Sequence, residues 1–126
     1  MAGNVTYLRQ KLKVDAVNAF YECLKDYKKT IVAFEQLAMM PAPQFYVEFN
    51  LARRMVSLIE RGKPLPIENE NKLAMYKELH RRWKSKGVAS YESLQDIINE
   101  PAPCFYRSPE SLKLIVYRQL KSERKR

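Results

Sequence analysis

Pro41-Ala42-Pro43-Gln44-Phe45-Tyr46 is the stretch of sequence that decides the fold, because the chain repeats it sixty residues later. The second copy reads Pro101-Ala102-Pro103-Cys104-Phe105-Tyr106, so only one of the six positions differs. Apolar pairs precede both copies, and helical patterns follow both. Self-similarity at a fixed offset is the sequence signature of a repeated supersecondary unit. The sequence therefore predicts one helical unit that is present twice.

Apolar residues recur at three- and four-residue spacing along most of the chain, which predicts an all-α fold. Each copy should contain a long helix, a short helix, a proline-rich connection and a third helix. The helices expected in the first copy cover about residues 5–29, 30–38 and 48–61. Those expected in the second copy cover about residues 69–84 and 91–99, followed by a last helix that starts at 108–110.

Several residues are expected to mark the helix ends. Asp15 could interrupt the first long helix as an internal cap, and Thr30 is expected to cap the short helix that follows. Gly62 should end the third helix. In the second copy, Ser90 and Ser108 stand where capping hydroxyl groups are favoured, and a proline follows Ser108 at the first helical position.

The repeat divides the chain into residues 5–62 and 67–126, joined by the linker Lys63-Pro64-Leu65-Pro66. A unit of about 60 residues buries only a modest fraction of its surface. We therefore expect a single domain over residues 1–126, in which two tandem three-helix units share one core through their long helices. A short helix, a connection and a further helix are helix-turn-helix-like, although the connection of about seven residues exceeds the usual three or four.

The repeated motif itself predicts a structural joint. A proline disfavours helical geometry in the residue before it and donates no backbone hydrogen bond, so each motif should end the short helix. The aromatic rings could stack on unpaired bases. Alternatively, one ring fills the core and the other closes the loop through its hydroxyl group. The residues of this joint are Pro41, Pro43, Phe45, Tyr46, Pro101, Pro103, Phe105 and Tyr106.

The net charge of +9 indicates a partner class. A small chain this basic attracts polyanions, first nucleic acid and then an acidic protein or an anionic membrane, although the charge could also serve solubility alone. No run approaches the roughly 18 apolar residues of a membrane helix, and the N-terminus lacks the regions of a secretory signal. We therefore expect a cytoplasmic location, no membrane partner, and reduced thiols at Cys23 and Cys104.

The sequence offers little for catalysis. It contains no glycine-rich phosphate loop, no nucleophile motif and no cluster of His and Cys at metal-ligand spacing. We therefore expect a protein that is not an enzyme and that has no cofactor, no metal and no small-molecule substrate. Carboxylates near helix ends are more simply explained as solvated or dipole-pairing groups. They are Glu68, Glu70, Asp96 and Glu100.

Basic residues on the third helix of each copy are the candidates for nucleic-acid binding. They lie off the expected apolar stripe, where Arg and Lys can donate to phosphate or base edges. They are Arg53, Arg54 and Arg61 in the first copy, and Lys113, Arg118 and Lys121 in the second. A further basic cluster exists in the second copy alone and comprises Arg81, Arg82, Lys84 and Lys86.

The duplicated Pro-Ala-Pro-x-Phe-Tyr motif, followed in the second copy by Ser108-Pro109-Glu110-Ser111 and a basic helix, resembles a group of small uncharacterised proteins. These proteins are carried by bacteriophages and other mobile elements of gut bacteria. The resemblance covers about residues 15–121 and is better in the second copy, because Glu48 replaces the capping serine in the first. It implies a mobile-element setting in a bacterial host and no particular activity.

Together these features predict a non-enzymatic DNA-binding or nucleoprotein accessory factor of a phage or mobile element. Its partner would be nucleic acid, with duplex DNA favoured, and the basic third helices would contact the backbone or groove. The alternative is a protein-interaction or assembly subunit, such as a phage structural component or a homo-oligomer, whose basic face meets an acidic partner.

Overall fold

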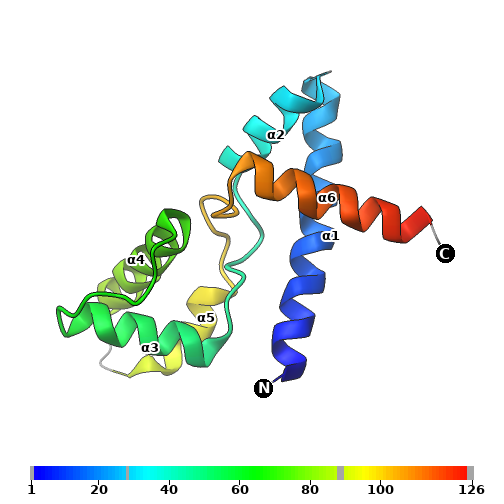
Figure 1. Ribbon diagram of the computed structural model, residues 1–126. Helices are drawn as coiled ribbons and strands as arrows, with labels where there is room; N and C mark the ends of the chain where they lie inside the picture. Colours follow the sequence, from blue (N-terminus) through cyan, green and yellow to red (C-terminus); the bar gives the residue numbers. More distant parts are fainter. Residues whose placement is uncertain (1, 28, 88–89, 125–126) are drawn as a thin grey trace.

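The computed structural model describes residues 2–27, 29–87 and 90–124. Over these residues the regular structure is helical, which confirms the predicted all-α fold. The elements are α1 (Ala2–Asp26), α2 (Thr30–Met39), α3 (Phe49–Glu60), α4 (Glu70–Ser85), the 3₁₀ helix η1 (Tyr91–Ser93), α5 (Leu94–Ile98) and α6 (Pro109–Arg124) (Figure 1).

The helices pack as two three-helix bundles, and each bundle contains helices from both copies of the repeat. α1, α2 and α6 pack against one another, and α3 packs against α4 and α5. The third helix of each copy therefore belongs to the bundle of the other copy (Figure 1). α1 and α4 lie in different bundles, which corrects the expectation that the copies join through their long helices. The exchanged third helices tie the copies together instead.

The two proline-rich connections cross between the bundles. Ala42 and Ala102 exchange two backbone hydrogen bonds of 2.9 Å in an isolated antiparallel bridge. The Phe45 ring stacks on Tyr106, and the Tyr46 ring stacks on Phe105, with ring centroids 6.0 and 5.9 Å apart. When the two copies are interchanged, the alanine bridge maps onto itself and each ring pair maps onto the other ring pair. The crossing is therefore the centre of an approximate two-fold symmetry.

One hydrophobic cluster runs through both bundles and the crossing. Ala42, Phe45, Ala102 and Phe105 are each less than 5% exposed within it. Burying an aromatic side chain of this kind stabilises a fold by roughly 1.5–3 kcal/mol. The motif residues between the two prolines and after them thus contribute directly to the core.

The expected helix ends are confirmed at three positions. The Ser90 hydroxyl accepts a hydrogen bond from the Glu92 backbone N–H at 3.2 Å, and the Ser108 hydroxyl accepts one from Ser111 at 3.1 Å. Gly62 follows α3 with a φ of +70°, a conformation that favours glycine. Glu48 also caps α3, since its carboxylate accepts from the backbone N–H groups of Asn50 and Leu51.

Two other expected caps are wrong. Thr30 is the first residue of α2, and Lys29 occupies the cap position without a side-chain hydrogen bond. Asp15 lies inside the uninterrupted α1, where its carboxylate accepts from Lys11 at 3.2 Å and from the Tyr46 hydroxyl at 2.6 Å. The side chain of Asp15, which the local pattern had assigned to a helix end, therefore binds Lys11 one turn earlier in α1 and the tertiary partner Tyr46.

α2 and α3 follow one another in the chain but belong to different bundles. A helix-turn-helix instead packs its two consecutive helices together across a short turn. A three-helix unit with a basic third helix exists here only when that helix comes from the other copy. The predicted resemblance to a helix-turn-helix is therefore not confirmed for α2 and α3.

Candidate nucleic-acid interface

The outer face of α3 carries three arginines around a shallow surface hollow of about 270 Å³. Ala52, Met55 and Val56 face the core, so the side chains at the intervening positions face solvent. The hollow is lined by Asn50, Arg53, Arg54, Ser57 and Arg61 from α3 and its end, and by Tyr91 from η1. The sequence-predicted residues of the first copy thus meet at one place.

Tyr91 forms an aromatic wall of this hollow. Its ring stacks on Trp83 with centroids 4.8 Å apart and an interplanar angle of 6°. The Trp83 indole N–H donates to the Ser90 carbonyl at 3.0 Å, so the stacked pair is fixed at the start of η1. The Arg53 guanidinium lies 6.0 Å from the Tyr91 ring centroid, at the outer range of a cation–π contact. The hollow therefore combines guanidinium groups with an immobilised ring.

Sequence reasoning missed Tyr91 as part of this surface. Tyr91 belongs to the second copy and α3 to the first, and they meet only because the third helices are exchanged. Nothing in the spacing of the two segments signals that exchange. The tyrosine was visible in the sequence only as part of the expected short helix.

The outer face of α6 is different, although it carries the other three predicted residues. Lys113, Arg118 and Lys121 are exposed, and the Lys113 ammonium lies 5.9 Å from the Tyr117 ring centroid. Leu114 and Tyr117 are 55% and 42% exposed on the same helix. This face is therefore both cationic and apolar.

The six predicted cations have no acidic partner in the part of the chain that the structure describes. Among the residues that the structure describes, none of the six takes part in an ion pair. Arg61 donates to the Ser57 carbonyl at 3.4 Å, which holds its side chain against α3 without removing its charge. These positive charges remain available to an external anion.

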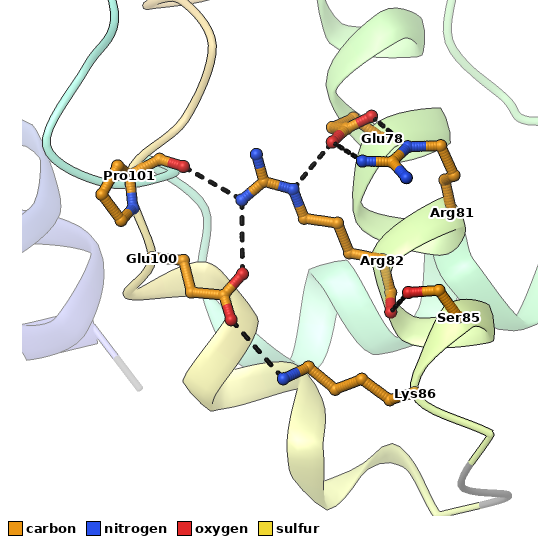
Figure 2. A network of polar contacts seen from close by, with 7 residues as sticks. All are labelled: Glu78, Arg81, Arg82, Ser85, Lys86, Glu100 and Pro101. Atoms are coloured by element: carbon orange, nitrogen blue, oxygen red, sulfur yellow. Dashed lines mark hydrogen bonds and ion pairs between the residues drawn. The ribbon is translucent and has the colours of Figure 1, made fainter.

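The basic cluster of the second copy forms ion pairs within the protein (Figure 2). Glu78 accepts from both Arg81 and Arg82 at 2.7 Å, and the hydrogen bonds from Arg81 and then Arg82 lower the pKa of this carboxyl to about 2. Arg82 also donates to Glu100 at 3.3 Å and to the Pro101 carbonyl at 2.9 Å. Lys86 pairs with Glu100, and Lys84 pairs with Glu60. The cluster therefore secures the second connection to α4.

Arg82 reaches the first connection as well, since its guanidinium lies 5.0 Å from the Phe45 ring centroid. One side chain thus contacts α4, the end of α5 and both motif copies. The charge pairs around it are partly exposed, and pairs of that kind stabilise a fold only modestly. Its multiple contacts make Arg82 a positioning residue of the crossing.

The motif residues occupy the joint and not an open surface. Phe45 and Phe105 are buried, and each stacks on the tyrosine of the other copy. Burial, followed by the hydrogen bond to Asp15, raises the pKa of Tyr46. Pro41, Pro43, Pro101 and Pro103 are exposed and flank the bridged alanines. The rings support the interpretation of an anchor over that of a base-stacking platform.

The described part of the chain holds no group of three or more His, Cys, Asp or Glu side chains placed to bind a metal ion. His80, for example, contacts Glu60 at 3.3 Å, within the same set of contacts as Lys84. Within the same described residues, no helix combines the length and the apolarity that crossing a membrane requires.

No protein-family model, curated protein or solved structure matches the chain.

Proposed function

We propose that this protein is a non-enzymatic DNA-binding or nucleoprotein accessory factor, acting in the cytoplasm of a bacterial host as part of a phage or mobile element. The outer face of α3 supplies the principal contacts through Arg53, Arg54 and Arg61. The outer face of α6 supplies further phosphate contacts through Lys113, Arg118 and Lys121. The partner is duplex DNA.

The observation that carries this proposal is the division of the cations into two sets. Each cation of the cluster around Arg81 and Arg82 forms an ion pair with a neighbouring carboxylate, whereas the described residues provide no acidic partner for the six cations on α3 and α6. Surface charge that is already paired contributes little to attracting a polyanion. Unpaired Arg and Lys release counterions when they meet phosphates, which is the main source of sequence-independent affinity.

The symmetry of the fold adds a geometric argument. The two third helices are related by the approximate two-fold symmetry of the crossing, since α6 packs against α1 and α2 as α3 packs against α4 and α5 (Figure 1). Two-fold related helices suit two segments of a duplex backbone, as in dimeric DNA-binding proteins. In this chain both helices belong to one polypeptide.

The proposal is tested by mobility shift with a duplex at several salt concentrations. Affinity should fall steeply between about 50 and 200 mM salt. Arg53→Ala combined with Arg54→Ala should weaken binding and reduce the salt slope by about two units, one for each lost phosphate contact. Arg81→Ala combined with Lys86→Ala is the matched control, because it removes two charges that are already ion-paired within the protein and should change binding far less.

Absence of any shift at low salt would refute DNA binding. Equal losses in both double variants would show that net charge, and not the α3 face, determines binding. Arg53→Glu and Lys113→Glu, with circular dichroism to verify the helices, extend the test to both third helices. Normal binding by both charge reversals would exclude these surfaces.

The second candidate function is that of a protein-interaction or assembly subunit with an acidic partner, and the apolar part of the α6 face favours it. Leu114 and Tyr117 are exposed beside Lys113 and Arg118. Aromatic and apolar residues flanked by charge are typical of protein interfaces. This function predicts a defined oligomer or a captured partner that survives nuclease treatment, measured by light scattering and affinity capture.

A further inference from the structure

A cavity of about 180 Å³ lies beside the crossing, where the start of α4 meets the end of the second connection. The first connection contributes Tyr46 to its wall, so both copies of the motif reach it. Its polar lining consists of Asn69, Asn71, Lys72, Arg107, Ser108 and Ser111. This cavity is separate from the hollow on α3 and shares no lining residue with it.

The lining has the chemistry of an anion site. It contains two cations, Lys72 and Arg107, and no carboxylate. Neither cation forms an ion pair among the residues that the structure describes. Although Arg107 is exposed as a whole residue, partial burial of its guanidinium lowers its pKa. A partly desolvated cation without a counter-ion is unfavourable, and a bound anion would relieve that cost.

The second copy departs from the first at this point of the motif. Val47 follows Tyr46 and is buried at 6% exposure, whereas Arg107 follows Tyr106 and lines the cavity. Tyr106 has a φ of +56° and is the one non-glycine residue in the described part of the chain with a positive φ. Such a conformation costs of order 1 kcal/mol or more. The second connection thus contains a strained Tyr106 and, in place of the buried Val47, an Arg107 that lines the cavity.

We propose that this cavity binds the terminal phosphate group of a phosphate monoester. Arg107 and Lys72 neutralise the phosphate, and the Ser111 hydroxyl and the Asn71 amide donate hydrogen bonds to its oxygens. Arg is well suited to this role, because its planar guanidinium donates two parallel hydrogen bonds to phosphate. The two helix starts at the cavity are already capped by Asn69 and Ser108, so the site depends on side chains.

The volume limits the size of the ligand. Pockets for drug-sized ligands measure roughly 300–1,000 Å³, so a cavity of 180 Å³ accommodates a phosphate and at most a small group attached to it. Phe105 and Tyr106 provide an aromatic wall beside the cations. A mononucleotide with its base outside the cavity and the 5′-phosphate end of an oligonucleotide present the same phosphate monoester chemistry.

The site is tested with the full chain by ¹H–¹⁵N NMR titrations with inorganic phosphate and with AMP, against chloride at equal ionic strength and against acetate. Saturable shifts should appear at the amides of residues 69–72 and of Arg107, Ser108, Glu110 and Ser111. Arg107→Gln and Lys72→Gln should each weaken binding at least tenfold, and Arg107→Lys should restore part of it. Lys77→Gln is the matched control, because it removes an exposed cation of α4 that does not line the cavity.

A 5′-phosphorylated oligonucleotide and its 5′-hydroxyl twin distinguish the two sources of phosphate. A preference for the phosphorylated strand that Arg107→Gln abolishes identifies a nucleic-acid end as the ligand, and binding of AMP without such a preference identifies a small molecule. Shifts that do not saturate, that acetate reproduces equally, or that persist in Arg107→Gln would overturn the proposal. Because Arg53 and Arg54 remain intact in these variants, the outcome is independent of DNA binding by α3.

Discussion

The two third helices are alike on the inside and different on the outside. Ala52 and Val56 of α3 correspond, at the offset of sixty, to Leu112 and Val116 of α6, and all four are buried. On the outer faces Arg54 corresponds to the exposed Leu114, and Ser57 corresponds to the exposed Tyr117. The comparison separates what the fold requires of a third helix from what a partner would require of it.

The exchange of the third helices requires apolar residues at the inner positions, since each third helix must pack in the bundle of the other copy. The outer positions are free of that requirement, and they have diverged into an arginine-lined hollow on α3 and a mixed apolar and cationic face on α6. The symmetry of the fold therefore does not extend to its surfaces. Substitutions at corresponding positions should show where the equivalence of the two copies holds and where it ends.

The largest effect is expected at the crossing. Phe45→Ala and Phe105→Ala each remove a buried ring that stacks on the tyrosine of the other copy. Each substitution should lower the free energy of unfolding by about 3–5 kcal/mol, the usual cost of deleting a buried phenylalanine. Urea denaturation measures both. A nearly neutral effect at one of the two positions would break the equivalence of the copies at the joint.

A smaller, pH-dependent effect should be confined to the second copy. Hydrogen bonds from Arg81 and Arg82 lower the pKa of Glu78 from its ordinary 4.5 to about 2. A depressed pKa stabilises the fold above the unfolded-state value and loses that contribution as the pH falls from about 4.5 through about 2. The melting temperature of the wild type should therefore fall more as the pH is lowered over this range than the melting temperature of Glu78→Gln. Melting temperatures that depend on pH in the same way in both proteins would contradict the stabilising role of the hydrogen bonds to Glu78.

The caps of the third helices should contribute equally despite their different chemistry. Glu48 and Ser108 both accept hydrogen bonds from backbone N–H groups in the first turn. Glu48→Ala and Ser108→Ala should each cost about 1 kcal/mol of unfolding free energy. Chemical denaturation of the two variants side by side checks the prediction. A neutral Glu48→Ala would show that only the second copy has an effective cap.

The smallest effect on stability is expected when the outer residues are interchanged. Leu114→Arg and Arg54→Leu alter exposed positions, so each should change the free energy of unfolding by no more than about 0.5 kcal/mol. Leu114→Arg should strengthen duplex binding and increase the salt slope by about one unit, and Arg54→Leu should do the reverse. Loss of a captured protein partner in Leu114→Arg, without any change in DNA binding, would instead favour the assembly function.

The sequence was sufficient to predict the helices and the position of the joint. Local spacing places the apolar faces, and Ser90, Ser108 and Gly62 mark helix ends through their own hydrogen bonds or backbone geometry. The six cations predicted to be exposed are exposed. These features depend on neighbours within a few residues, which a single sequence contains.

The exchange of the third helices could not be predicted from the sequence. Both copies present similar apolar stripes, so α3 would suit the bundle of either copy by pattern alone. The hollow with Tyr91 and the pairing of Arg82 with Pro101 depend on tertiary arrangement and were missed for the same reason. Asp15 was assigned to a helix end because its tertiary partner, Tyr46, lies far along the chain.

The exchange has a consequence for the order in which the protein folds during synthesis. α3, α4 and α5 are consecutive in the chain, so their bundle can close as soon as residue 98 has left the ribosome. The other bundle needs α6, which follows the other described helices in the chain, and contacts at long sequence separation form slowly. The apolar surface of α1 and α2 that α6 covers must therefore remain uncovered until α6 has been made, although α1 and α2 can already pack against each other.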